Sequence, residues 1–280
     1  MDEAERHVLH AVVLRDEQIE LVAGDAQLVT YLRSSAKPIQ ARVVVRSRPD
    51  LDDEQIAVMC ASHRATPEQL EIVRRLLAAA PATEDELECG AAPTPIEHNC
   101  SGKHAGFLAL CRSEGWPADG YRLLEHPCQQ AVIREVAELA GVDSGSMPVG
   151  VDGCGVPTFA LPLERAARAF ARLREGEEGR RVVSAMRAHP ELLRGPVGVD
   201  ARVAERLDGW VAKGGAEGLF CASSADRLAV ALKCEDGSFR ALATAFDHIL
   251  ERLGLDAPRL TDGVVTSSRG EHVGRIRVVA

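Results

Sequence analysis

Segments with the pattern of β-strands stand near both ends of this chain, and helical patterns fill the stretch between them. Near the N-terminus, "HVLHAVVLR" (7–15) and "QIELVAG" (18–24) are rich in apolar and β-branched residues and predict a hairpin. Towards the other end, strands are predicted at 218–223, 226–234 and 271–279. Because strands and helices do not alternate strictly, we expect an α/β protein of the α+β type. Its antiparallel or mixed sheet would be made from both chain ends and packed with helices.

The central helices are predicted from their start signals and their apolar spacing. Asp52 precedes one apolar run with Gln55 three residues later, and Thr66 precedes the next with Gln69 three residues later, as in a capping box. Further helices are predicted at 104–114, 126–141, 164–175, 178–188, 199–208 and 241–254. We find no repeat and no clear linker, and expect loops at 84–95 and 194–200. The chain is therefore expected to form one catalytic domain over residues 1–280, with a helical subdomain in its middle.

Composition excludes several functional classes. The 33 Lys and Arg residues face 42 Asp and Glu residues, which gives a net charge of −9, and no basic stripe suggests a nucleic-acid partner. No stretch approaches the roughly 20 apolar residues of a membrane span, and the acidic N-terminus does not resemble a secretory signal. Eight cysteines in a chain of this size are typical of a reducing compartment, where they serve as core residues, metal ligands or nucleophiles. We therefore expect a cytoplasmic protein.

The octapeptide "RSSAKPIQ" (33–40) places a serine three residues before a lysine at a predicted helix start. Pro38 is best accommodated in the first turn of a helix, which puts the start near Ser34 or Ser35. Ser34 and Lys37 would then lie on one helix face, where a neutral lysine can take the proton of a serine nucleophile. The alternative is a serine cap followed by a solvated lysine.

Two glycine-rich segments, "EHNCSGKHAG" (97–106) and "VDGCGVP" (151–157), concentrate thiols and positive charge. Lys103 falls about one helical turn after Cys100, close enough to favour a thiolate. Cys100 and Cys154 could jointly hold a soft or borderline metal such as zinc, although they are not a CxxC pair. The alternative is that both cysteines are small buried core residues.

Two other segments carry reactive side chains. In "MCASH" (59–63), Ser62 precedes His63, but adjacent side chains rarely point the same way, so a second hydroxyl in a shared pocket is favoured over a triad. "KGGAEG" (213–218) lacks the spacing of a phosphate-binding loop. We expect Lys213 to lie on the way into a strand and to face a serine nucleophile, with a plain turn as the alternative.

Taken together, these segments resemble the asparaginase II family, the thermolabile or rhizobial-type L-asparaginases. The matching stretches span residues 33 to 277 in family order: "RSSAKPIQ", "CASH", "HNCSGKHAGFL", "DGCGVPTFALPL", "MRAHPELLRG", "KGGAEG" and "SSRGEHVGRIR". The resemblance implies a fold like that of serine β-lactamases and glutaminases. It also implies hydrolysis of L-asparagine to L-aspartate and ammonia by a cytoplasmic homodimer.

The resemblance also assigns roles to individual residues. It implies a Ser–Lys acyl-enzyme mechanism with two serine–lysine pairs: Ser34 with Lys37, and Ser62 with Lys213. It implies a Zn²⁺ site made of Cys100, Lys103 and Cys154. Three further positions match residues near the substrate: Arg33, His104 and Asp152.

Two departures from the family pattern leave alternatives open. This chain reads "RATPEQLEIV" (64–73) where the family usually has a Gly-Glu-Pro run, and it begins later than is usual in the family. One alternative is a glutaminase or another acyl-enzyme hydrolase on the same scaffold; the absence of a clear Ser-Asp-Asn motif counts against a β-lactam substrate. The other is a catalytically silent, zinc-holding homologue that binds amino acids.

Overall fold

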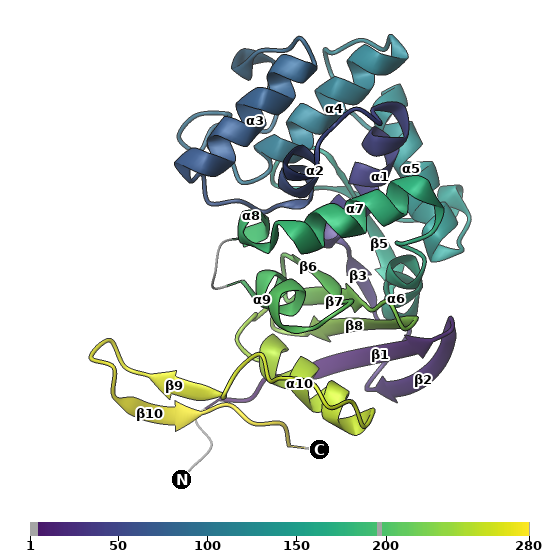
Figure 1. The fold of residues 1–280 in the computed structure, drawn as a ribbon. Coiled ribbons are helices and arrows are strands. Elements are labelled where there is room, and N and C mark those ends of the chain that lie inside the picture. The colour runs from purple at the N-terminus through teal and green to yellow at the C-terminus, as the bar shows by residue number, and fades with distance from the viewer. Residues whose placement is uncertain (1–4, 195–197, 280) are drawn as a thin grey trace.

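An antiparallel sheet forms the lower half of the molecule in Figure 1, and most of the helices gather above it. The computed structural model describes residues 5–194 and 198–279. The order of the five main strands is β2-β1-β8-β7-β6, and every neighbouring pair is antiparallel. Their bounds are β1 Leu9–Arg15, β2 Gln18–Ala23, β6 Val211–Gly215, β7 Leu219–Ser223 and β8 Leu228–Cys234. The predicted N-terminal hairpin and the α+β class with an antiparallel sheet are confirmed.

Alternating side chains bury both faces of this sheet. In β1, Val12 and Leu14 join the larger core under the helices, whereas Ala11 and Val13 join a second core on the other face. That second core is completed by α10 (Leu242–Arg252), which contributes Phe246. The alternation follows from the period-2 geometry of a strand, and it explains why the middle of each central strand is apolar on both faces.

The remaining helices are given by their bounds in chain order. They are α1 Lys37–Ser47, α2 Asp53–Cys60, α3 Pro67–Ala79, α4 Ser101–Glu114, α5 Pro127–Ala140, α6 Leu163–Ala171, α7 Gly176–Ala188, α8 Pro190–Arg194 and α9 Val199–Arg206. Both predicted capping boxes are present at α2 and α3. The predicted start at residue 104 is three residues late, because α4 begins at Ser101, and α8 was not predicted.

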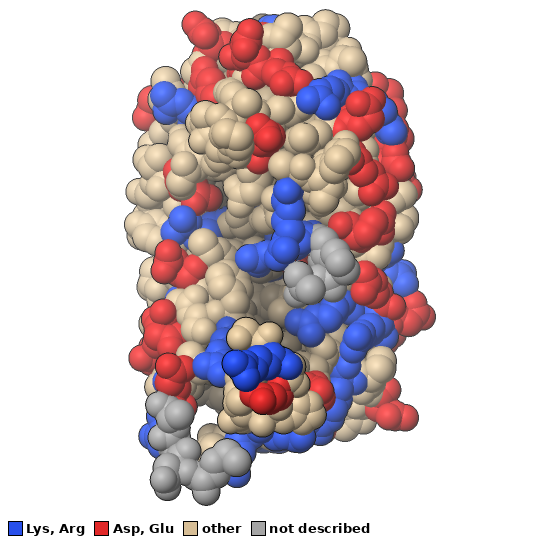
Figure 2. Space-filling model, turned by 90° about the vertical axis from the view of Figure 1, so that its left-hand side faces the viewer, with Lys and Arg blue, Asp and Glu red and all other residues tan. Residues whose placement is uncertain are grey.

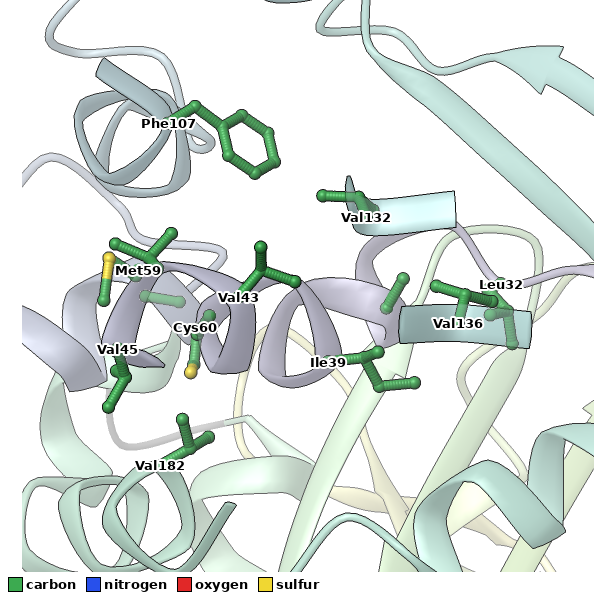
Figure 3. Packing of buried hydrophobic residues seen from close by; sticks show 14 of the residues in the cluster. Leu32, Ile39, Val43, Val45, Met59, Cys60, Phe107, Val132, Val136 and Val182 are labelled. Carbon is green, nitrogen blue, oxygen red and sulfur yellow. The ribbon is translucent and has the colours of Figure 1, made fainter. Parts of the chain in front are cut away.

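Helix α1 is the central helix, and α2, α4, α5 and α7 pack around it. Figure 3 shows Ile39 and Val43 of α1 among side chains of the surrounding helices. Residues 37–45 are all buried, including the charged side chains of Lys37 and Arg42. A helix surrounded on all sides holds its residues rigidly, so the start of α1 is a well-supported place for reactive groups.

Glycine allows α4 to pack closely on α2. A Cβ atom at Gly102 would lie 2.3 Å from the Val58 carbonyl oxygen, and one at Gly106 would lie 2.4 Å from Met59 Sδ. The lack of a side chain at these two positions therefore permits the close approach of the helices. The contact brings the first turn of α4, with Lys103, against the end of α2 that leads to Ser62.

A small second sheet supports the turn before α1. Strands β3 (Val29–Tyr31), β5 (Pro157–Pro162) and β4 (Val149–Val151) pair in the order β3-β5-β4. These strands were not predicted: β3 and β4 have only three residues each, and β5 begins and ends in proline, which argues against a strand. Their ends deliver Arg33 and Asp152 to one place.

The C-terminal segment differs from the prediction. Residues 271–279 were expected as a strand of the main sheet, but the strand there is β10 (His272–Arg275), which pairs with β9 (Val264–Thr266). The exposed side chains of β10 offer no apolar face to bury against the main sheet. Figure 1 shows this hairpin projecting from the body. The expected loop at 194–200 includes residues 195–197, which lie outside the described residues.

Among the described residues, none of the helices combines the length and the apolar character that crossing a bilayer requires. The expectation of a single catalytic domain with a helical subdomain stays a prediction.

Candidate functional site

Lys37 is the buried centre of the candidate site. Its Nζ donates hydrogen bonds to the carbonyl oxygens of Ala61 at 2.5 Å and Asn99 at 3.2 Å, and to Ser62 Oγ at 3.2 Å. These acceptors follow the end of α2 and precede the start of α4. The lysine therefore ties together three segments that are far apart in the sequence.

The surroundings of Lys37 increase the fraction of its side chain that is neutral. Burial, together with the positive charges of Lys213 and Lys103, lowers the pKa of Lys37 from its ordinary value to about 8, against an opposing effect of Cys100. At neutral pH about a tenth of such a lysine is unprotonated, which is enough for a general base.

Ser34 lies one turn before Lys37, as its spacing predicts, but in a 3₁₀ turn over Arg33–Ala36 that precedes α1. Pro38 stands in the first turn of α1, as expected. Ser34 is partly exposed, and its hydroxyl makes no hydrogen bond to another described residue. The neighbouring Ser35 is fully buried, and its hydroxyl donates to the Leu32 carbonyl oxygen at 2.6 Å. Of the two serines in the turn, Ser34 is the one accessible to a substrate.

Lys213 lies on the edge strand β6, where it forms a buried ion pair that was not predicted. Its Nζ donates to Asp200 Oδ2 at 2.9 Å, and both side chains are almost fully buried. Burial opposes ionisation of Asp200, but the charge of Lys213 prevails and lowers the pKa of the carboxyl. The expected contact between Lys213 and Ser62 is not among the hydrogen bonds of the described residues.

Glycine places β6 directly against the turn that carries Ser34. A Cβ atom at Gly215 would lie 2.5 Å from the Leu32 carbonyl oxygen and 3.3 Å from the Ser35 nitrogen. The glycines after Lys213 therefore permit a close approach and do not form a phosphate-binding loop.

Cys100, Lys103 and Cys154 come together as the sequence predicts. Lys103 Nζ donates to Cys154 Sγ at 3.0 Å, and Cys100 Sγ donates to Asn99 Oδ1 at 3.4 Å. The two cysteines interact with each other, and neither is in a disulfide. All three side chains are buried. Two sulfur atoms and an amine thus converge on one enclosed point, a donor set that suits a borderline ion such as Zn²⁺.

The two thiols differ in acidity. The hydrogen bond from Cys154, helped by the charges of Lys37 and Lys103, holds the pKa of Cys100 well below its usual range. The same hydrogen bond, together with burial, raises the pKa of Cys154. Burial opposes protonation of Lys103, but the charge on the sulfur atoms raises its pKa. The positive charges of Lys37 and Lys103 therefore make Cys100 the more acidic of the two thiols.

Arg33 and Asp152 form a partly exposed ion pair beside Ser34. Arg33 Nε donates to Asp152 Oδ1 at 2.7 Å, and a guanidinium nitrogen lies 3.7 Å from Glu217 of the β6–β7 turn. Arg33 has a φ of +50°, and its backbone N–H donates to Thr158 Oγ1 at 3.0 Å. The strained backbone aims the guanidinium at Asp152.

His104 does not reach this surface. It is fully buried, with Nδ1 2.7 Å from the Tyr121 hydroxyl oxygen and Nε2 without a hydrogen-bond partner among the described residues. Burial lowers the pKa of His104 well below its usual value, so it is a neutral core residue. His63 likewise turns from Ser62, with Nε2 2.8 Å from Ser101 Oγ, as expected from the adjacent positions.

The departure from the family pattern after Ser62 has a definite structure. Gln69 accepts hydrogen bonds from the backbone N–H groups of Arg64 and Thr66 and donates to the Leu192 carbonyl oxygen in α8. The Ser62 N–H donates to the Leu193 carbonyl oxygen at 2.8 Å. The unusual segment is therefore fixed to α8 beside the site.

Sequence reasoning missed Asp200 and Glu217. Asp200 follows Val199 in the first turn of a predicted helix, where an acidic residue is ordinary. Glu217 lies in "KGGAEG", but only the folded chain brings it near Arg33.

The described geometry joins a buried lysine, two serines and a thiol pair. The sequence model of the L-asparaginase II family matches residues 2–278, nearly the whole chain. The chain belongs to the L-asparaginase II family. The resemblance read from the sequence motifs is thereby confirmed, and the site residues of this L-asparaginase II family member lie within the matched range.

No curated protein matches the chain. Among solved structures, it is similar to a beta-lactamase from Mycobacterium bovis, with 16% identity, a TM-score of 0.41 and coverage of 82% of this chain and 88% of that one. It is also similar to EstCE1, a hydrolase with promiscuous acyltransferase activity, with 13% identity, a TM-score of 0.43 and coverage of 81% and 88%. Likenesses this distant say nothing further about this family member.

Proposed function

We propose that this protein hydrolyses the side-chain amide of L-asparagine to L-aspartate and ammonia through an acyl-enzyme on Ser34. The observation that carries the proposal is the buried Lys37, whose lowered pKa makes it a base one turn from an accessible serine. Membership of the L-asparaginase II family supports the substrate class.

In the first half-reaction, Ser34 Oγ attacks the amide carbon and its proton passes to neutral Lys37. The backbone N–H of Ser34 itself, within the 3₁₀ turn, stabilises the developing oxyanion. The carbon–nitrogen bond then breaks, and the leaving nitrogen takes a proton from Lys37 by way of Ser62 Oγ. The contact of 3.2 Å between Lys37 Nζ and Ser62 Oγ supports this relay.

In the second half-reaction, water attacks the acyl carbon and gives its proton to Lys37, and the Ser34 oxygen leaves with a proton returned by Lys37. The two halves together consume one water molecule and release ammonia and aspartate. Lys213, paired with Asp200, acts on the reaction by its fixed positive charge, which disfavours protonation of Lys37. Its role here is electrostatic and not that of a base for Ser62.

Arg33 and Asp152 are suited to the two charges of a free amino acid. The guanidinium would bind the α-carboxylate and the carboxylate would bind the α-ammonium, in place of their present contact with each other. Figure 2 shows Lys and Arg side chains bordering a hollow in one face of this chain of net charge −9. A basic rim around a hollow favours a ligand that bears a carboxylate. The family resemblance implies that His104 contacts the substrate. Because His104 is fully buried against Tyr121, it would instead support the residues that line the site.

Cys100, Lys103 and Cys154 would hold a Zn²⁺ ion, since their donor atoms already converge. A bound ion would supply positive charge near Lys37 and tie the loop of Cys154 to α4. Lys103 must be unprotonated to bind it, so occupancy would depend on pH. The homodimer and the cytoplasmic location implied by the family stay predictions.

A panel of amides tests the proposed function. Ammonia release by the purified chain is measured on L-asparagine and L-glutamine, and ring opening of a chromogenic β-lactam is measured by its colour change. The zinc content is determined on the same sample. Faster turnover of L-asparagine than of L-glutamine supports the proposal. Turnover of L-glutamine alone would indicate a glutaminase, and zinc binding without turnover of any substrate would indicate a silent homologue; either result overturns the substrate named here.

A further inference from the structure

The pairing of β1 with β8 brings the N-terminal segment against the end of β8. Leu9 pairs with Cys234 in this antiparallel register, and the Glu235 N–H donates to the Val8 carbonyl oxygen at 2.9 Å. The register leaves His7 beside the turn that follows β8. The chemistry gathered there is unused by the proposed reaction.

Three side chains of different chemistry meet at this point. His7 Nδ1 lies 2.7 Å from Asp236 Oδ2, and Cys234 Sγ donates to Asp236 Oδ1 at 2.9 Å. Their three ligand atoms all lie within 4.8 Å of one another. They form the one such group of three His, Cys, Asp or Glu residues among residues 5–194 and 198–279.

We propose that His7, Cys234 and Asp236 form a second metal site, which takes a thiophilic divalent transition ion of the Zn²⁺ class. One imidazole nitrogen, one sulfur and one carboxylate oxygen supply three ligands of a tetrahedral ion, and water completes the fourth position. The sulfur and nitrogen donors select against Mg²⁺ and Ca²⁺, which prefer all-oxygen ligands.

The site is close to the geometry that such an ion requires. Zinc bonds of about 2.0–2.3 Å place tetrahedral ligand atoms roughly 3.3–3.7 Å from one another. The two hydrogen-bond distances, 2.7 and 2.9 Å, are shorter than this and involve different oxygens of Asp236, while all three ligand atoms lie within 4.8 Å of one another. Shifts of about 1 Å would therefore bring the ligands to the separations of a tetrahedral site. The ion displaces the thiol proton of Cys234, which leaves to solvent as the metal–sulfur bond forms.

Two of the three ligands are fixed by the fold before any ion binds. Cys234 is buried at the end of β8, and its N–H donates to the Gly218 carbonyl oxygen at 2.9 Å. Asp236 Oδ1 also accepts from the Ser238 N–H at 2.9 Å, which orients the carboxylate. His7 is carried by the N-terminal segment and is the ligand that binding would order.

The site adjoins one wall of the catalytic centre. A Cβ atom at Gly218 would lie 2.9 Å from Cys234 Cβ, and Lys233 Nζ donates to the Glu217 carbonyl oxygen at 2.5 Å. Glu217 in turn approaches Arg33. An ion at this position would therefore clamp the N-terminal segment and the β6–β7 turn to the end of β8, and would stabilise the fold.

Metal content tests the proposal independently of the Cys100–Lys103–Cys154 site and of the proposed activity. The metal-stripped full chain is loaded with Zn²⁺, desalted and analysed for zinc per chain, as wild type and as the variants Asp236→Asn and His7→Gln. Glu235→Gln is the matched control, because Glu235 pairs with His10 and takes no part in the cluster. We expect each of the two cluster variants to lose about one zinc per chain and the control to lose none.

Two further readouts locate the ion. In the Co²⁺-loaded chain, the bond between Cys234 and cobalt should give a sulfur-to-cobalt charge-transfer absorption. Cys234→Ser should remove this absorption, whereas Cys154→Ser, at the other cysteine cluster, should leave it unchanged. Zn²⁺ at a hundredfold excess over its dissociation constant should raise the Tm of the wild type by about 4 °C more than that of Asp236→Asn. Equal zinc content in the wild type, His7→Gln and Asp236→Asn would overturn the proposal. A Zn²⁺-induced rise in Tm that is the same in Asp236→Asn as in the wild type would also overturn it.

Discussion

Lys37 Nζ lies 3.2 Å from Ser62 Oγ, while the hydroxyl of Ser34, three residues before Lys37, makes no hydrogen bond to another described residue. Ser62 thus contacts the buried lysine, Ser34 lies in the turn just before it, and the second lysine, Lys213, is paired with Asp200. This arrangement favours one base that serves both serines over two independent serine–lysine pairs.

The pH dependence of turnover should report the ionisation of Lys37. Because the neutral amine is the base, and the pKa of Lys37 is lowered to about 8, the active fraction increases as pH rises. We expect kcat/KM to increase about tenfold per pH unit below about pH 8 and to level off above it. Steady-state ammonia release across the pH range measures this. A profile that falls through pH 8 would show that the charged lysine is the active form.

Removal of Asp200 should destabilise the protein because it leaves Lys213 charged and unpaired in the core. We expect Asp200→Asn to lower the free energy of unfolding by about 3–5 kcal/mol, measured by urea denaturation. The double variant Asp200→Leu with Lys213→Met removes both charges and should recover much of that loss. A double variant less stable than Asp200→Asn would contradict the account.

Gly102→Ala should disturb the contact between α2 and α4. Its Cβ would lie 2.3 Å from a backbone oxygen, so a helix must shift, at a cost of about 1–3 kcal/mol in unfolding free energy. Thermal unfolding measures the loss. Gly153→Ala is the control, since a Cβ there meets no atom within 4 Å. Equal effects of the two substitutions would show that close packing at Gly102 is unimportant.

Arg33→Ala should weaken substrate binding more than it slows the chemical step. Its guanidinium is proposed to hold the α-carboxylate, a group that does not change during the reaction, so the main effect should be an increase in KM. We expect an increase of about tenfold or more, from the loss of a charged hydrogen bond. Initial rates against L-asparagine concentration measure it, with Glu217→Gln as a neighbouring control. An unchanged KM would remove Arg33 from the substrate site.

The sequence predicted the fold where patterns are local. The hairpin of β1 and β2, the capping boxes at Asp52 and Thr66 and the position of Pro38 depend on short spacings, and the structure confirms them. The strand β5 was missed because its prolines argue against a strand. The β10 strand was assigned to the wrong sheet because pairing partners are not encoded in a single strand's pattern.

The sequence indicated which residues belong to the candidate site better than it indicated which of them contact one another. Family motifs grouped Cys100, Lys103 and Cys154 because their segments carry distinctive residues. The structure places Lys103 Nζ 3.0 Å from Cys154 Sγ, and the role of the three residues as metal ligands stays a prediction. The partner of Lys213 could not be predicted, since Asp200 lies near an ordinary helix start and only packing of α9 against β6 joins them. His104 was expected near the substrate from its motif, but its side chain is fully buried. That burial depends on how α4 packs, which the motif does not encode.

Ammonia release from L-asparagine by the wild type and by Ser34→Ala tests the central claim most directly. Circular dichroism and thermal unfolding would first establish that the variant is folded, which is expected because the Ser34 hydroxyl has no partner among the described residues. We predict that turnover falls by about a thousandfold or more, since the nucleophile is lost. Turnover within about tenfold of the wild type in a folded Ser34→Ala variant would contradict an acyl-enzyme on Ser34.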